Sequence, residues 1–292
     1  MANKDNNIKL IECPRDAMQG IEEFIPTDKK AEYINSLLKV GFDTIDFGSF
    51  VSPKWIPQLK DTAEVLSKLD LENTDTDLLA IVANLRGAKD ACQFPEIKYL
   101  GFPFSISETF QKNNINATIK ESLGRVEDIQ IVLSICEQFD KELIVYISMA
   151  FGNPYGDPWS TEYIFQWTKI LSDMGVKKIA LSDTVGMSNP DSIKVVFSTL
   201  IRDFPHIEFG AHFHTTPDTW EEKVRAAYES GCRRFDGAIK GMGGCPMSGY
   251  DLVGNMAMEN LFSYFNEINE IDGIDKKSFW NSMQLAKDVF PG

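Results

Sequence analysis

The chain has 292 residues, of which 43% are hydrophobic and 25% are charged, the composition of an ordinary globular protein. A chain of this length can bury roughly three quarters of the surface that it exposes when unfolded, so it needs no disulfide or metal ion in order to fold. The formal net charge of −14 argues against nucleic acid and against an anionic membrane as partners, and no run approaches the ~20 apolar residues of a membrane span.

Short strand patterns alternate with helical patterns along the whole chain. Runs rich in β-branched and aromatic residues predict eight strands, at residues 8–13, 42–50, 78–84, 97–105, 143–151, 177–183, 207–214 and 233–239. Amphipathic segments between them predict helices, several of which end on a glycine, at residues such as 28–41, 119–140, 161–175 and 218–231. Eight alternations of strand and helix predict a (β/α)₈ TIM barrel of class α/β, and a doubly wound open sheet is the alternative.

Residues 1–292 are predicted to form a single domain, because no linker or low-complexity tract interrupts the alternation. The barrel is expected to occupy about residues 8–240. A glycine-rich loop and two C-terminal helices are expected at about residues 241–292.

The cysteines and the N-terminal sequence bear on the compartment. The five cysteines have no CxxC spacing, and they are Cys13, Cys92, Cys136, Cys232 and Cys245. An odd number without a disulfide framework favours a reducing environment. The opening residues, MANKDNNIKL, match neither a secretory signal nor an Arg-rich transit peptide. We therefore expect a soluble cytoplasmic protein.

The expected active site follows from the barrel itself, because barrel enzymes place their chemistry at the C-terminal ends of the strands. Polar residues at or just after those ends are therefore candidates. They are Arg15, Asp16, Asp46, Ser49, Asp183, His212, His214, Cys245 and Asn255.

His212 and His214 are two of only three histidines in the chain. Side chains two apart on a strand share one face, with Cα atoms about 6.5–7 Å apart, so both imidazoles can converge on one ion. Asp16 and Asn255 are placed to add oxygen ligands, and this donor set favours an octahedral divalent cation such as Mg²⁺ or Mn²⁺. A structural zinc site is not expected, because no thiolate cluster is present. The alternative is a pair of hydrogen-bonded strand histidines with no ion.

Two other candidates have two interpretations each. Arg15 either forms a structural ion pair at the barrel rim or stabilises the oxyanion of a developing enolate. Cys245 lies among glycines in GMGGCPMSG, where the backbone can bend sharply and move as a lid would. It is either a catalytic loop residue or an inert small residue of a turn.

Several segments together resemble a known family. PRDAMQG at residues 14–20 resembles a strand-one motif of the aldolase-like metal-dependent lyase and synthase barrels. Further segments resemble the 3-hydroxy-3-methylglutaryl-CoA lyases within that group, from the first strand to the final loop. They are SFVSPKWIPQ (49–58), SETFQKNNIN (107–116), DTVG (183–186), HFH (212–214), GMGGCP (241–246) and GN (254–255).

The resemblance implies a fold, a reaction and a metal site. The reaction would be the retro-Claisen cleavage of an acyl-CoA, 3-hydroxy-3-methylglutaryl-CoA, to acetyl-CoA and acetoacetate, as in leucine degradation. The divalent metal, Mg²⁺ or Mn²⁺, would be bound by Asp16, His212, His214 and Asn255. Arg15 would stabilise the enolate of acetyl-CoA.

The resemblance also implies roles in proton transfer and substrate binding. Asp16 or His212 would remove the hydroxyl proton, and Cys245 would take part in protonating the enolate, since a free thiol with a pKa of about 8.5 can donate a proton near neutral pH. Asp46 and Asp183 would be further catalytic carboxylates. The substrate-binding residues would be Arg15, Gln19, Ser49 and Lys54, and a homodimer is implied.

Some residues depart from the family pattern, and they cluster around the expected substrate pocket. Asp46 stands where the lyases have Glu, Ala17 stands where they have Gly, and TTPDTW follows His214 in place of their pattern. Three alternatives follow. The chain could cleave citramalyl-CoA or a longer 3-hydroxy-3-alkylglutaryl-CoA, it could be a Claisen-condensing synthase, or it could be a catalytically silent binding barrel.

Overall fold

The computed structural model describes residues 7–135, 140–244 and 253–290. Its eight parallel strands form a closed barrel, because β1 pairs with both β2 and β8. The barrel prediction is therefore confirmed and the open sheet is excluded. The strands are β1 (Lys9–Glu12), β2 (Thr44–Ser49), β3 (Asp77–Ile81), β4 (Ile97–Ser105), β5 (Glu142–Ser148), β6 (Lys178–Asp183), β7 (Glu208–Phe213) and β8 (Arg234–Gly237).

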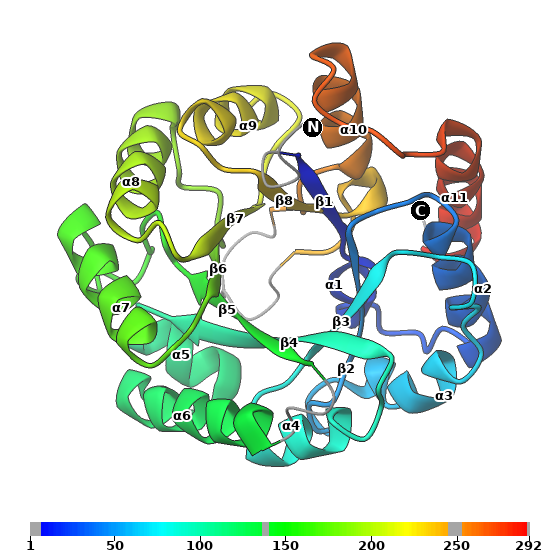
Figure 1. Cartoon of the computed structure of the whole chain (residues 1–292), viewed down its shortest axis with the longest axis horizontal. Coiled ribbons are helices and arrows are strands. Elements are labelled where there is room, and N and C mark those ends of the chain that lie inside the picture. The colour runs from blue at the N-terminus through cyan, green and yellow to red at the C-terminus, as the bar shows by residue number, and fades with distance from the viewer. Residues whose placement is uncertain (1–6, 136–139, 245–252, 291–292) are drawn as a thin grey trace.

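Helices surround the strands in a ring (Figure 1). In chain order they are α1 (Pro14–Gln19), α2 (Thr27–Leu38), η2 (Pro57–Leu59), α3 (Thr62–Leu66), α4 (Leu85–Ala91), α5 (Glu108–Ile115), α6 (Ile119–Ile135), α7 (Thr161–Asp173), α8 (Pro190–Asp203), α9 (Trp220–Glu229), η4 (Ile239–Gly241), α10 (Met258–Glu267) and α11 (Lys276–Val289). Among the described residues, no helix is both long enough and apolar enough to cross a membrane.

The two predicted C-terminal helices are present: α10 packs against β8, where Phe265 meets Phe235 at a ring-centroid distance of 4.9 Å, and α11 packs against α2. In Figure 1, α11 lies beside α2. Phe279 of α11 meets Phe42 edge-on at a ring-centroid distance of 6.3 Å, and Phe290 meets Tyr33 of α2 at 5.5 Å. These aromatic contacts tie the end of the chain to its first βα unit.

Two predicted strands end earlier than their apolar runs. The third stops at Ile81, because Asn84 turns its side chain back to accept a hydrogen bond from the backbone of Gly87 and caps α4. The fifth stops at Ser148, because Met149 has a left-handed backbone with φ of 60°. Both ends begin loops at the mouth of the barrel.

The barrel interior has two chemically different sides. Alternate residues of β3, β5 and β6 form an apolar cluster separate from the large core beneath the helices, and they are Leu79, Ile81, Ile144, Tyr146 and Ala180. On the side of β7 and β8, the residues at the corresponding alternate positions are polar or small. They are Glu208, Gly210, His212, Arg234 and Asp236.

Candidate active site

The first group of site residues lies on α1, directly after β1. Pro14 begins this helix. An N–H at the first helical position has no partner within the helix, so proline loses no helical hydrogen bond there. Arg15 and Asp16 follow and are 8% and 6% exposed. The turn from strand to helix therefore places two charged side chains at the mouth.

The second group lies where β7 ends, and a later segment comes to meet it. His214 forms an isolated antiparallel bridge with Asn255. Asn255 donates from Nδ2 to Oδ2 of Asp16 at 2.7 Å, a contact across 239 positions of sequence. Gly243 passes closely over this contact, since a Cβ there would lie 2.9 Å from Nδ2 of Asn255 and 2.8 Å from the Asp16 carbonyl oxygen. The structure thus brings Asp16, His214 and Asn255 together, as the sequence predicts.

The two imidazoles are oriented by their Nδ1 atoms. His212 Nδ1 is 3.1 Å from Oδ2 of Asp236, and His214 Nδ1 is 3.0 Å from the carbonyl oxygen of Val253. The rings are 5.5 Å apart between centroids. Within the described part of the chain no hydrogen bond is formed by either Nε2. Each histidine therefore keeps one nitrogen for a ligand while the other is fixed, the usual arrangement of metal-binding histidines.

The donors at this point fit a divalent cation. Burial lowers the pKa of His214 to about 4, with the neighbouring His212 adding to the effect, so this imidazole is neutral at physiological pH. Burial opposes charge on Asp16, but Arg15, the two histidines and Asn255 outweigh it and hold the pKa of Asp16 below its usual value. Because Nδ2 of Asn255 is bonded to Asp16, its amide oxygen is the atom that remains as a potential metal ligand. A carboxylate, an amide oxygen and two imidazoles suit Mg²⁺ or Mn²⁺.

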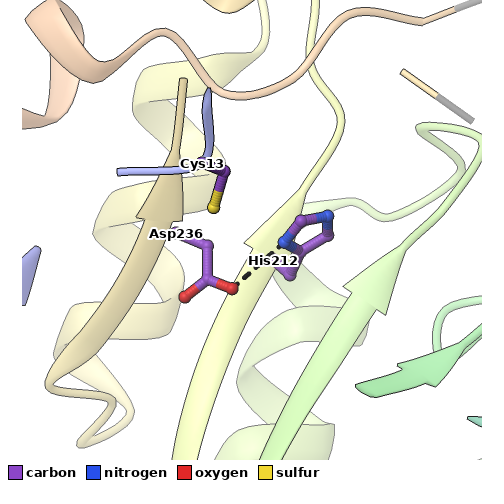
Figure 2. Close-up of side chains that lie close together, drawn as sticks. All are labelled: Cys13, His212 and Asp236. Atoms are coloured by element: carbon purple, nitrogen blue, oxygen red, sulfur yellow. Dashed lines mark hydrogen bonds and ion pairs between the residues drawn. The ribbon is translucent and has the colours of Figure 1, made fainter. Parts of the chain in front are cut away.

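A second cluster lies deeper. Figure 2 shows Cys13, His212 and Asp236 facing one another, with potential ligand atoms within 4.8 Å of each other. Burial and the nearby carboxylates raise the pKa of the Cys13 thiol well above its usual value, so the sulfur stays protonated and is a poor ligand. The nearest atoms of His212 and Asp236 are already joined by a hydrogen bond. We interpret this cluster as the support behind His212 rather than as the metal site.

Arg15 is held by three side chains. Its Nε and Nη2 donate to the same oxygen of Asp46 at 3.0 and 2.6 Å, and its Nη1 donates to Asp16 at 2.9 Å and to Gln19 at 2.8 Å. Burial raises the pKa of Asp46 to about 6 even though Arg15 opposes the shift. The rim ion pair considered for Arg15 is therefore present. Because Arg15 also lines the cleft described below, the enolate role stays open beside it.

The Asp183 carboxylate is bonded to a lysine and a serine and does not line the cleft described below. Its carboxylate accepts hydrogen bonds from the Lys223 ammonium at 2.7 Å and from the hydroxyl of Ser188 at 2.5 Å. Lys223 and Asp183 are 2% and 1% exposed. This buried pair fastens the loop after β6 to α9, and the catalytic role predicted for Asp183 stays a prediction.

A cleft of about 530 Å³ opens over these residues. Arg15, Asp16, Gln19 and both mouth histidines line it, together with Trp55, which is 67% exposed at the rim. Its far wall is formed by residues 112–116 and Arg125.

Several predicted residues do not line this cleft. The Ser49 hydroxyl accepts from the backbone N–H of Val51 at 3.1 Å and shapes the turn, and Lys54 is exposed outside the cleft. Residues 215–218, where the sequence departs from the family pattern, are also absent from the lining, so the TTPD segment does not form the pocket wall. Cys245 lies outside the described residues.

Three polar residues beneath the mouth carried no role in the sequence analysis. They are Tyr146, Arg234 and Asp236, which are 7%, 3% and 2% exposed. Alternation along β8 places residues 234 and 236 on one face, in register with Gly210 and His212 of β7. The alternation that puts His212 and His214 on one face also pairs Arg234 with Asp236, whereas Tyr146 lies on β5 and has no such signal.

Known proteins match the chain over nearly its full length. A family model described as HMGL-like matches residues 7–285. The cytoplasmic 3-hydroxy-3-methylglutaryl-CoA lyase of Rattus norvegicus is 33% identical over 92% of this chain and 77% of its own length. The hydroxymethylglutaryl-CoA lyase of Bacillus subtilis is 33% identical over 85% of this chain and 81% of its own.

Solved structures agree in fold. An HMG-CoA lyase from Acinetobacter baumannii, in complex with coenzyme A and 3-methylmalate, superposes with a TM-score of 0.89. The two sequences are 31% identical, and the match covers 99% of this chain and 93% of the other.

Proposed function

The chain belongs to the HMGL-like family, that of the hydroxymethylglutaryl-CoA lyases, and on this premise we propose that it cleaves 3-hydroxy-3-methylglutaryl-CoA to acetyl-CoA and acetoacetate. The observation that carries the proposal is the convergence of Asp16, His212 and His214 beside Arg15 at one cleft, with Asn255 hydrogen-bonded to Asp16 and bridged to His214. The cleavage needs a base, a group that stabilises an enolate and an acid. Each function has a candidate on this chain.

The proposed cofactor is a divalent cation, on which the HMGL-like family in general depends. Asp16, His212, His214 and Asn255 would hold it, with Mg²⁺ and Mn²⁺ both compatible with their donor atoms. When bound, the cation would lower the pKa of the substrate hydroxyl and fix the orientation of its oxygens. The hydrogen bonds to Asp236 and Val253 keep both histidines turned for this purpose.

A base, Asp16 or His212, takes the proton of the C3 hydroxyl, and that oxygen becomes the ketone of acetoacetate. The electron pair of the C2–C3 bond moves into the thioester and gives the enolate of acetyl-CoA. Arg15, held by Asp46 and Gln19, is positioned to stabilise the enolate oxygen. A proton delivered to C2 then forms the methyl group of acetyl-CoA.

The proton donor in the last step is proposed to be Cys245, by resemblance alone. Asp46 supports the reaction through Arg15, whose guanidinium it binds twice. Asp183 remains a proposed participant. Its contacts with Lys223 and Ser188 would restrict its role to shaping the mouth.

The substrate is proposed to lie along the cleft between the loop at 51–56 and the wall at 112–116. Lys112 and Arg125 line this wall, so the path is locally basic although the chain carries a net charge of −14. Gln19 lines the cleft and would contact the acyl group, whereas substrate binding by Ser49 and Lys54, neither of which lines the cleft, stays a prediction. A cytoplasmic location, a homodimer and a part in leucine degradation stay predictions.

A panel of acyl-CoA substrates tests the proposal. Purified protein with added Mg²⁺ or Mn²⁺ is incubated with 3-hydroxy-3-methylglutaryl-CoA, a longer 3-alkyl homologue and citramalyl-CoA, and products are identified by mass. We expect acetyl-CoA and acetoacetate from the first. Faster cleavage of another substrate would overturn only the acyl assignment, whereas no cleavage of any would overturn the lyase proposal. Condensation of acetyl-CoA with a keto acid would support the synthase instead.

A further inference from the structure

Arg234 is a buried cation inside the barrel, one layer beneath the mouth. It is 3% exposed and lies on β8, in register with Gly210 of β7 and Lys9 of β1. Its Nη2 donates to the hydroxyl of Tyr146 at 3.3 Å and lies 3.5 Å from Oδ1 of Asp236, an ion-pair contact too long for a hydrogen bond. Arg234 therefore contacts Tyr146, which lines the cleft, and Asp236, which supports His212.

The neighbouring strand makes room for this side chain. Gly210 has no Cβ, and one built there would lie 2.9 Å from Nη1 of Arg234, 3.2 Å from its Cγ and 3.3 Å from its Cδ. Real Cβ atoms essentially never approach a neighbour below 3.0 Å. The position of the guanidinium therefore depends on glycine at residue 210.

The contacts of Arg234 run upward to the site. Asp236 binds Arg234 through Oδ1 and His212 through Oδ2. Tyr146 accepts from Arg234 through its hydroxyl oxygen, and its ring meets the His212 ring edge-on at 5.6 Å. Tyr146 and His212 both line the cleft, while Arg234 does not.

We propose that Arg234 is a positioning residue that fixes, through Asp236, the orientation of His212 with Nδ1–H toward the barrel interior and Nε2 toward the cleft. The inference rests on the proposed function, in which Nε2 of His212 binds the metal. Arg234 touches neither substrate nor ion. It acts by holding a carboxylate, in the way that outer partners of metal-binding histidines set which ring nitrogen is free.

A purely structural role would not account for these contacts. Filling this space with an apolar side chain would avoid the desolvation of a guanidinium and a carboxylate, which is often as stable or more so. Here Nη1 of Arg234 and Oδ1 of Asp236 are both buried without a hydrogen bond. The chain therefore retains two buried charged groups, Arg234 and Asp236, whose hydrogen bonds are incomplete. They lie where Asp236 orients His212.

The nitrogen signals of the imidazoles give a direct test without substrate. With only three histidines, of which His206 is bonded to Ser172 at the surface, a long-range ¹H–¹⁵N spectrum of histidine-labelled, metal-free protein at pH 8.5 resolves each ring. The spectrum of a His206→Gln variant assigns the surface histidine. We expect His212 of the unaltered protein to show a protonated Nδ1 and a bare Nε2.

Three variants then perturb Arg234 in different ways. Arg234→Met removes the charge, and we expect the ratio of the Nδ1–H tautomer of His212 to its Nε2–H tautomer to fall by about tenfold or more. Gly210→Ala keeps the charge but displaces the guanidinium, and we expect a change in the same direction. Arg234→Lys keeps a cation and should return the spectrum toward that of the unaltered protein.

Mn²⁺ affinity, followed by electron paramagnetic resonance, gives a second readout. Arg234→Met should weaken binding by about tenfold, the lower end of what loss of an outer partner produces. The matched control is Arg233→Met, one residue earlier, because that guanidinium lies over the Tyr228 ring at 4.6 Å and donates to backbone carbonyls outside the barrel interior. The control should leave both readouts unchanged.

The outcomes separate the hypotheses. An unchanged His212 spectrum in folded Arg234→Met and Gly210→Ala proteins overturns the inference, as does an equal change in the Arg233→Met control. If Arg234→Met does not fold, the Gly210→Ala and Arg234→Lys spectra decide by themselves. A His212 response in a protein that cleaves no acyl-CoA would uphold the inference and leave the proposed function as the part that failed.

Discussion

The two sides of the barrel interior follow different chemical rules. On the side of β3 and β5, Leu79, Ile81 and Ile144 pack as an apolar cluster. On the side of β7 and β8, which lies across the ring in Figure 1, His212 and Asp236 occupy comparable inward positions. The first side is stabilised by removing apolar surface from water, and the second only by pairing every charge that it buries.

The difference shows where function is located in this fold. The apolar side can exchange side chains of similar volume with little loss. The polar side cannot, because each group there is a partner of the next, from Arg234 through Asp236 to His212. Substitutions on the two sides should therefore differ in kind, which the following predictions test in order of decreasing effect.

The largest effect is expected from His212→Ala, at the top of the polar side. Loss of this imidazole removes a proposed metal ligand and a candidate base, so acyl-CoA cleavage should fall by about a thousandfold or more. Metal content and turnover measured together check this. His206→Ala, which alters the surface histidine bonded to Ser172, is the control and should retain both. Full metal content in His212→Ala would contradict the proposed site.

Asp46→Asn is expected to have the next largest effect, because it removes the carboxylate that Arg15 contacts twice. Arg15 keeps Asp16 and Gln19 as partners, so the loss in unfolding free energy should be near the lower end for a broken buried pair, about 3 kcal/mol. Denaturant unfolding of the purified variant measures it.

Asp46→Glu provides the comparison for this variant. It keeps the charge and restores the residue that the resembling lyases carry, so it should lose much less stability than Asp46→Asn. Equal losses in the two variants would show that packing volume rather than the ion pair matters at this position.

Metal affinity should depend on pH through one histidine, not two. Burial opposes protonation of His212, but Asp236 and Asp16 outweigh it and raise the pKa of this imidazole above 6.5, whereas the pKa of His214 is lowered to about 4. Protons compete with the metal only below the pKa of each ligand. Affinity should therefore be fully present above the pKa of His212 and fall by about tenfold per pH unit below it, down to pH 5. Titration of Mn²⁺ across this range measures the slope, and a hundredfold loss per unit would refute the assignment.

The smallest effect is expected from Ile144→Val on the apolar side. Removing one methylene should lower the unfolding free energy by about 1 kcal/mol. Mn²⁺ affinity and the His212 spectrum should not change, because no polar contact is touched. A change in either would mean that the two sides are coupled more closely than their contacts indicate.

Sequence patterns predicted the elements better than the partners of charged residues. All eight strands were predictable because buried parallel strands consist of apolar β-branched runs. The meeting of Asp16 with Asn255 followed from the rule that strand ends share one mouth. Both inferences use geometry that the fold imposes on any sequence.

Other features had no local signal. Lys223 pairs with Asp183 across 40 positions, and nothing in the helical pattern of α9 distinguishes this lysine from a solvated one. Arg234 stands in a strand, where a charged residue is ordinarily expected at a solvent-facing position. Met149 ends β5 with a left-handed backbone that its side chain does not favour. Each depends on tertiary neighbours, which no short window of sequence contains.

The contact between Asp16 and Asn255 has a consequence for the order in which the protein is made. All eight strands are complete by Gly237, whereas Asn255 follows 18 residues later in the sequence. A nascent chain that has not yet released Asn255 from the ribosome has all eight strands but lacks one proposed ligand and the helices α10 and α11. Metal capture would then be among the last events of synthesis, after all the strands that surround the site have been made.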